Sequence, residues 1–249
     1  MALNLIVVNH YEELSQKAAE IIEQLIQSHP ASILGLATGS TPIGLYQELI
    51  KRYQQGAISF EKVRTINLDE YIGLAEDHPQ SYHAFMKKHL FDEIAIPKEQ
   101  THLPNGNASF LDEECLRYER LIEKIGPADV QLLGIGSNGH IGFNEPGSSF
   151  SSETHVIKLA QSTREANARF FHSVDEVPSH AITMGIASIL KSKKILLLAS
   201  GPSKTAALRR LLQQKKEEAF PASVLCSHPH VTLIADREAW ADLPQPETI

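Results

Sequence analysis

An imidazole, a carboxylate and two amides lie close together on one glycine-rich segment of the chain, Gly134 to Pro146. These side chains belong to Asn138, His140, Asn144 and Glu145. The glycines of the segment allow backbone N–H groups to approach a ligand closely. His140 titrates near neutral pH and can both donate and accept a proton, and a carboxylate five residues on can orient it. We therefore expect an acid–base site in this segment.

The first six residues of the segment also match a dinucleotide-binding pattern, G-x-G-x-x-G, after an apolar run. That pattern requires a helix directly after the glycines and an acidic residue about 20 positions further on. Gly142, Pro146 and Gly147 oppose a helix here, and no acid stands at a suitable strand end. We therefore expect no nicotinamide binding.

Short apolar runs alternate with amphipathic helical patterns along the chain. The expected strands are Leu5–Val8, Ile33–Ala37, Val63–Leu68, Val130–Ile135, Ile195–Ala199 and Val231–Ala235. The expected helices are Tyr11–Ser28, Pro42–Gln55, Ser81–Phe91, Leu111–Lys124, Arg164–Phe171 and Ser203–Gln214. The pattern predicts an α/β fold with a mostly parallel, open, Rossmann-like sheet and helices on both faces. We expect one domain over residues 1–249, in which residues 154–178 fit the alternation least well and are a candidate lid.

Polar clusters follow three of the expected strands. They are Thr38–Pro42, Asp69–Tyr71 and the Gly134–Pro146 segment. Ligands of open α/β sheets bind beyond the carboxyl ends of the strands, so we expect the three clusters to meet at one edge.

Gly39, Ser40 and Thr41 join an expected strand to an expected helix. Free N–H groups and hydroxyls at a helix start can hold an anion such as a phosphate. The alternative is that Ser40 or Thr41 only caps the helix, with Pro42 in its first turn. We favour anion binding.

Two cations are candidates for the same anion. Lys204 stands at the start of a helix, where a positive charge is unfavourable unless an anion binds beside it. Arg169 lies between apolar neighbours and can bind a phosphate with two donors. The alternatives, a solvated lysine and a surface ion pair, stay open.

Asp69 and Glu70 stand at the end of an expected strand. Adjacent side chains of an extended chain point to opposite faces, so we expect only one carboxylate to enter the site. That carboxylate suits a general base, although capping of the following segment is an equal alternative.

Composition excludes several classes of protein. A net charge of −7 argues against nucleic-acid binding, which needs a basic face. The two cysteines form neither a disulfide framework nor a metal cluster, and we expect no bound metal. No apolar run reaches the length of a membrane span, so we expect a cytoplasmic protein without a membrane partner.

The chain resembles the glucosamine-6-phosphate deaminase family of sugar-phosphate isomerases. The resemblance covers essentially the whole length, and the order and combination of its motifs are highly specific. The family-like stretches are Leu36–Pro42, Asn67–Tyr71, Gly134–Ser149, Ala166–Phe171 and the turn that holds Gly201 and Lys204.

The resemblance implies conversion of glucosamine 6-phosphate and water to fructose 6-phosphate and ammonia, without a cofactor, in amino-sugar breakdown. On matching positions, Asp69 is the base that moves the C2 proton towards C1. His140 serves ring opening, supported by Glu145 and Asn138. The implied phosphate ligands are Gly39, Ser40, Thr41, Arg169 and Lys204.

The chain departs from the family pattern at two places. Some members carry Asp at the position of Asn138, so we expect His140 to be less biased towards its protonated form here. Allosterically regulated members carry basic residues where this chain has His155 and Ile157. We therefore expect no activation by N-acetylglucosamine 6-phosphate, and either a monomer or a homo-oligomer.

Two other functions fit part of the pattern. A 6-phosphogluconolactonase shares the implied fold and a similar Gly-Ser-Thr-Pro loop, but Tyr71 and Phe143-Asn144-Glu145-Pro146 favour the deaminase. A non-catalytic sugar-phosphate sensor needs the phosphate ligands but not Asp69 and His140.

Overall fold

The seven-stranded parallel sheet forms the centre of the fold in this computed structural model, which describes residues 3–244. In spatial order its strands are β1 (Asn4–Val8), β10 (Val231–Asp236), β9 (Ile195–Ala199), β6 (Val130–Gly134), β2 (Ile33–Leu36), β3 (Arg64–Asn67) and β5 (Thr101–His102). Every strand pair in this sheet is parallel, as the apolar runs predicted.

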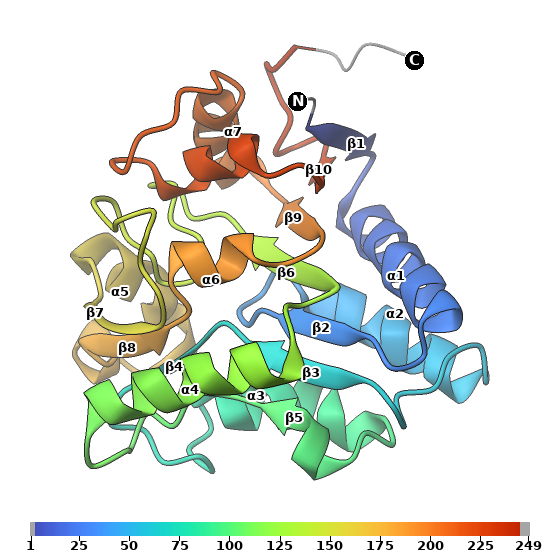
Figure 1. Ribbon diagram of the computed structural model, residues 1–249. Coiled ribbons are helices and arrows are strands. Elements are labelled where there is room, and N and C mark those ends of the chain that lie inside the picture. Colours follow the sequence, from blue (N-terminus) through green and yellow to red (C-terminus); the bar gives the residue numbers. More distant parts are fainter. Residues whose placement is uncertain (1–2, 245–249) are drawn as a thin grey trace.

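The strand order reverses between β2 and β6 (Figure 1). From β2 the chain builds outward through β3 to β5, and it then returns to the other side of β2 with β6, followed by β9 and β10. Loops that leave neighbouring strands at such a reversal diverge to opposite faces of the sheet. The crevice between them is the usual ligand site of open α/β sheets.

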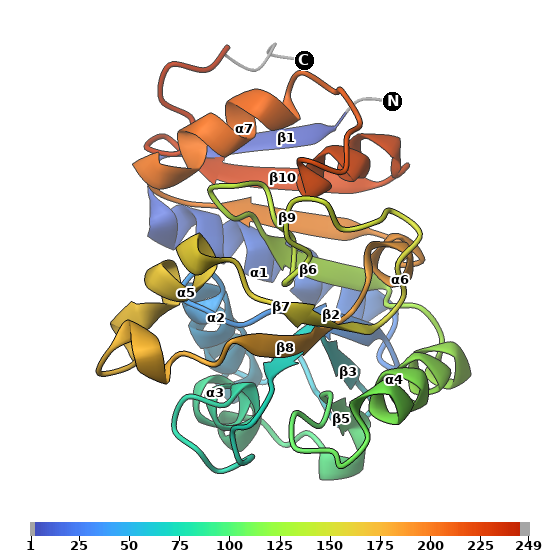
Figure 2. The same ribbon diagram turned by 90° about the vertical axis from the view of Figure 1, so that its left-hand side faces the viewer.

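Helices cover both faces of the large sheet. The helices are α1 (Tyr11–Ser28), α2 (Ile43–Gln54), α3 (Tyr82–His89), α4 (Leu111–Ile125), α5 (Gln161–Asn167), α6 (Ile186–Leu190) and α7 (Thr205–Leu211). Helices α1 and α2 lie on one face, and α4 and α6 lie on the other (Figures 1 and 2). In α1 the buried residues Leu14, Ala18, Ile22 and Ile26 recur every four positions, which is why this helix packs one apolar stripe against the sheet.

A second, antiparallel sheet of three strands lies in front of the first in Figure 2. It consists of β4 (Asp69–Tyr71), β8 (His180–Thr183) and β7 (His155–Lys158). Leu68 alone separates β3 from β4: its N–H donates to Leu36 of the large sheet, and its carbonyl accepts from Met184 beyond β8. The chain thus passes directly from one sheet into the other at this residue.

The sequence did not predict the small sheet. Its strands have three or four residues and carry carboxylates, histidines and threonines, so neither length nor alternation marks them. The candidate lid at residues 154–178 contains β7, α5 and two short turns, and the expected helix Arg164–Phe171 is α5 followed by a 3-10 turn at Ala168–Phe170. Movement of this segment stays a prediction.

Strand β5 and helix α6 were not predicted, and both are short, with two and five residues. The elements that were predicted agree with expectation to within a few residues at each end. Further 3-10 turns are Phe91–Glu93, Lys98–Gln100, Val174–Glu176, Pro202–Lys204 and Pro221–Ser227. Among residues 3–244 no helix combines the length and apolarity needed to cross a membrane.

Gly185 lies between strand β8 of the small sheet and helix α6. A substitution at this position tests how closely the chain packs there. A methyl group at Gly185 would lie 2.1 Å from the carbonyl oxygen of Ser152 and 2.2 Å from that of Glu153, both on backbone that cannot rotate away. We expect Gly185→Ala to lower the free energy of unfolding by about 1–3 kcal/mol, measured by urea denaturation. Gly134→Ala is the control, because nothing lies within 4 Å of its added methyl. Equal losses in the two variants would contradict the packing described.

Candidate active site

A cleft of about 460 Å³ opens over the carboxyl ends of β2 and β6, at the reversal of strand order. Eight of the nine site residues named from the sequence line it. They are Gly39, Ser40, Thr41, Asp69, Asn138, His140, Arg169 and Lys204. The ninth, Glu145, does not line the cleft but lies 3.8 Å from the His140 ring. The three polar clusters therefore meet at one sheet edge, as the order of elements predicted.

Asp69 begins β4 and is 6% exposed. Its carboxylate has no hydrogen-bond partner within residues 3–244, although it lines a cleft together with Leu68, Tyr82 and Phe143. Burial, and secondarily the negative charge of Glu70, raises the pKa of Asp69 to about 8. A carboxylate that is neither paired nor hydrogen-bonded is well suited to take a proton from a bound molecule.

Glu70 faces the other way, as the alternation of an extended strand requires. Its carboxylate accepts hydrogen bonds from backbone N–H groups of Tyr71, Tyr82 and His83 at 2.8–3.0 Å. One carboxylate of the pair therefore enters the cleft while the other fixes the start of α3. Asp69 does not cap α3: Ser81 is its N-cap, and Glu70 accepts from the next two backbone N–H groups.

His140 lines the same cleft as Asp69, on the loop after β6, with a side chain 24% exposed. Its Nδ1 atom is buried without a hydrogen-bond partner in the described part of the chain. Burial lowers the pKa of His140, Glu145 acts in the opposite direction, and the positive charge of Lys204 lowers it further. The ring is therefore predominantly neutral at neutral pH and can act as an acceptor first and a donor afterwards.

Gly136 allows the ring to take this position. A methyl group at Gly136 would lie 2.3 Å from Nδ1 and Cε1 of His140, so any side chain would displace the imidazole. Position 136 therefore requires glycine because His140 packs against it, and no cofactor is needed to explain this glycine of the motif.

Asn138 connects His140 to Glu145. Its side-chain oxygen accepts from the backbone N–H of His140 at 3.1 Å, and its amide donates to Glu145 Oε2 at 2.9 Å. The His140 Nδ1 to Glu145 Oε2 distance of 3.8 Å is longer than a hydrogen bond. Control of the His140 tautomer by Glu145 thus stays a prediction, while Asn138 makes the contacts that order the loop.

Thr163 is a supporting residue that the sequence did not reveal. Glu145 Oε1 accepts from the Thr163 hydroxyl at 2.5 Å and from the Ala160 N–H at 3.2 Å. Both donors come from α5 and the residue before it, inside the candidate lid. The contact could not be found from sequence because a threonine in a short helix carries no pattern of its own. Asn167 and Tyr82, which also line the cleft, were missed for the same reason.

The other end of the cleft is positively charged. Arg169 donates to the Ser40 hydroxyl at 3.0 Å, and burial, followed by the charge of Arg169, lowers the pKa of Lys204. No side chain caps α2, whose cap position is Pro42, so the hydroxyls of Ser40 and Thr41 are not used as caps. Two neighbouring cations beside hydroxyls that do not cap the helix form a site for an anion with several oxygens.

Replacing Asn138 by Asp tests the electrostatics of the His140 loop. A second negative charge beside the ring favours the imidazolium, so we expect Asn138→Asp to raise the pKa of His140. The check is an NMR titration of the His140 ring proton, assigned with His140→Gln. An unchanged titration curve would contradict the account.

The family model described as glucosamine-6-phosphate isomerases/6-phosphogluconolactonase matches residues 9–234. The glucosamine-6-phosphate deaminase of Geobacillus sp. (strain WCH70) is 55% identical over 242 residues, covering 97% of this chain and 96% of that protein. Glucosamine-6-phosphate deaminase 1 of Bacillus subtilis (strain 168) is 54% identical over 229 residues, covering 92% and 95% of the two chains.

Solved structures agree with these relatives. The structure of a protein described as a monomeric glucosamine-6-phosphate deaminase has a TM-score of 0.94 and 52% identity, covering 95% of this chain and 98% of that one. A 6-phosphogluconolactonase from Leishmania guyanensis has a TM-score of 0.78 at 22% identity, over 98% and 100% of the two chains, and shares the fold. The chain belongs to the glucosamine-6-phosphate isomerase/6-phosphogluconolactonase family.

Proposed function

We propose that this protein is a glucosamine-6-phosphate deaminase, which converts glucosamine 6-phosphate and water to fructose 6-phosphate and ammonia. The observation that carries the proposal is the placement of Asp69, a buried carboxylate without a hydrogen-bond partner among residues 3–244, in the same cleft as His140 and a two-cation site. Relatives that are 54–55% identical and carry this name support it.

In this proposal the phosphate group binds at the positively charged end of the cleft. Gly39, Ser40 and Thr41 supply N–H and hydroxyl donors, and Arg169 and Lys204 supply the charge. Binding far from C1 and C2 orients the reacting end of the sugar without changing its chemistry.

His140 acts first, on the closed ring of the sugar. It transfers a proton from the C1 hydroxyl to the ring oxygen, which breaks the C1–O5 bond and leaves a C1 carbonyl. A neutral imidazole can perform both halves of this transfer near pH 7. Glu145 and Asn138 support the loop that holds the ring.

Asp69 then moves a proton between carbons. It removes the C2 proton, and the electron pair forms a C1=C2 double bond while the C1 oxygen is protonated, which gives an enolamine. Return of the proton to C1 produces an imine at C2, and water attacks this carbon to release ammonia. The steps transfer protons and no hydride, so they require no redox cofactor.

The alternatives fit less well. The family model covers both activities, but the lactonase relatives at about 20% identity support the fold alone. A sugar-phosphate sensor needs the anion site and has no use for an isolated carboxylate opposite a histidine. The deaminase accounts for both ends of the cleft.

We also infer a cytoplasmic enzyme of one domain that acts on a small molecule as a monomer. A relative of 52% identity is described as monomeric, which supports a monomer here. The candidate lid, residues 154–178, carries Thr163, which contacts Glu145, and Arg169, which contacts Ser40. We infer that closure of the lid brings these two side chains to the cleft.

Asp69→Asn tests the base. The amide cannot accept the C2 proton, so we expect kcat for joint release of ammonia and fructose 6-phosphate to fall by about 10²-fold or more. Asp77→Asn, at an exposed position of the loop before α3, is the control and should keep wild-type activity. If wild-type protein binds the sugar phosphate but releases neither product, the deaminase is wrong and the sensor gains support.

Lys204→Met tests the anion site. Loss of one charge-assisted contact to phosphate, worth about 1.5–3 kcal/mol, should raise KM by about 10- to 100-fold. We expect kcat to change much less, because the lysine contacts the phosphate and not the reacting carbons. Lys215→Met, at a side chain 76% exposed, is the control. A loss confined to kcat would contradict the assignment.

A further inference from the structure

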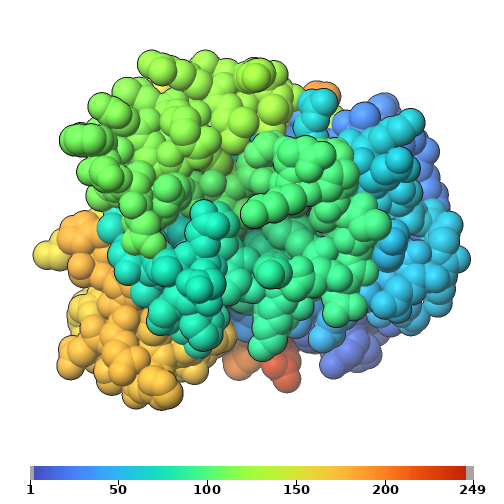
Figure 3. All heavy atoms as spheres, turned by 90° about the horizontal axis from the view of Figure 1, so that it is seen from below, coloured from blue at the N-terminus to red at the C-terminus, as the bar shows by residue number. Residues whose placement is uncertain are grey.

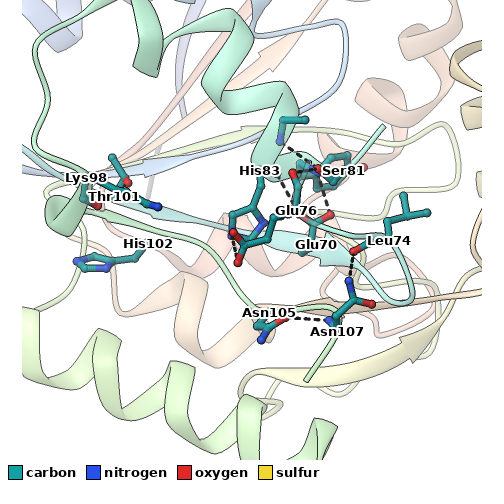
Figure 4. A network of polar contacts seen from close by, with 12 residues as sticks. Glu70, Leu74, Glu76, Ser81, His83, Lys98, Thr101, His102, Asn105 and Asn107 are labelled. Carbon is teal, nitrogen blue, oxygen red and sulfur yellow. Dashed lines mark hydrogen bonds and ion pairs between the residues drawn. The ribbon is translucent and has the colours of Figure 1, made fainter. Parts of the chain in front are cut away.

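The buried carboxylate of Glu70, next to the proposed base in β4, pairs with the partly exposed imidazole of His83. Glu70 is 1% exposed, and besides three backbone N–H groups its carboxylate binds His83 Nδ1 at 2.7 Å. Figure 4 shows the two side chains meeting beside Ser81, at the start of α3. With four donors the Glu70 carboxylate is fully hydrogen-bonded.

The hydrogen bond defines the state of the imidazole. An ionised carboxylate only accepts hydrogen bonds, so His83 Nδ1 must carry a proton. His83 Nε2 lies 3.9 Å from Glu76 Oε1, near the surface, and the ring is 22% exposed. The segment between β4 and α3, coloured teal, lies on the molecular face of Figure 3. A protonated His83 would thus stand between two carboxylates.

Glu70 is also the charge that acts on Asp69. The side chains that interact with Asp69 from the surrounding elements are the phenols of Tyr46 on α2, Tyr71 on β4, Tyr82 on α3 and Tyr118 on α4. Burial raises the pKa of each phenol, so they are uncharged. The negative charge of Glu70 remains, and it disfavours ionisation of Asp69.

The pair also fixes one wall of the cleft. Glu70 accepts from the Tyr82 N–H, and the Tyr82 ring stacks on Phe143 with centroids 5.9 Å apart. Tyr82 and Phe143 both line the cleft beside Asp69. The contact between β4 and α3 therefore sets the position of the base and of its aromatic surroundings together.

We propose that His83 is a positioning residue for the proton transfer: its hydrogen bond to Glu70 holds α3 against β4 and offsets the negative charge next to Asp69. The proposal rests on the proposed function, in which Asp69 is the base. It assigns to His83 an effect on the ionisation of Asp69 without contact with the substrate.

The test compares the pH dependence of kcat/KM in variants of opposite expected sign. Loss of the donor in His83→Phe leaves the Glu70 charge less compensated, so the acid limb should move to higher pH by roughly half a unit or more. Glu70→Gln removes the charge, so the limb should move to lower pH. The ionisation of the substrate amine is common to all variants and cancels in the comparison.

Further variants secure the interpretation. His83→Ala also removes the donor and replaces His83→Phe if that variant does not fold. His83→Asn keeps an amide donor near the Nδ1 position and should return the limb towards wild type. His89→Phe makes the same change at the other end of α3, away from Glu70, and should leave the limb unchanged. A ¹³C titration of the Asp69 carboxyl gives the same shift in a variant too slow for kinetics.

The outcomes separate the two proposals. Opposite shifts in the Glu70 and His83 variants support the inference. If the acid limb stays in place, or moves in the same direction in the His83 and Glu70 variants, the inference about His83 is wrong. The proposed deaminase function still stands in that case, provided that the wild-type protein turns over. Absence of wild-type turnover would instead remove the proposed function.

Discussion

Asp69 and Glu70 are neighbours in β4, and the alternation of side chains along an extended strand sends them to opposite faces. Asp69 enters the cleft without a hydrogen-bond partner in the described chain, and Glu70 accepts from four donors, three of which lie at the start of α3. The hydrogen bonds of Glu70 fix β4 against α3, and this holds Asp69 in place although Asp69 has no hydrogen bond of its own among residues 3–244. The position of the cleft wall, and the raised pKa of Asp69, both follow from this division.

Besides Asp69, the cleft is lined by two positively charged side chains, Arg169 and Lys204, and by the imidazole of His140. Arg169 and Lys204 bring two positive charges together in the cleft, where we propose that the phosphate group binds. Burial lowers the pKa of His140, and the charge of Lys204 lowers it further, so this lysine acts electrostatically on the histidine of the loop after β6.

The sequence predicted the large sheet, apart from the two-residue strand β5, and most of the predicted site residues line one cleft, because both depend on strong local patterns. Apolar runs marked the strands, and polar clusters after Ile33–Ala37 and Val63–Leu68 marked the strand ends. The small sheet was missed because its strands are short and polar. Thr163 and the Glu70–His83 pair were missed because they arise from contacts between elements that are distant in sequence or that turn back on each other. Such contacts depend on the assembled fold and leave no periodic signal.

The most direct test of the account is the ionisation of Asp69 itself. A ¹³C NMR titration of the Asp69 carboxyl in the substrate-free protein, assigned by its disappearance in Asp69→Asn, measures this without any assumption about the reaction. The account predicts a pKa of about 8, because the carboxyl is buried beside a charged neighbour. A value in the ordinary range for aspartate, near 4, would mean that the carboxylate is solvated or paired, and would contradict the site described here.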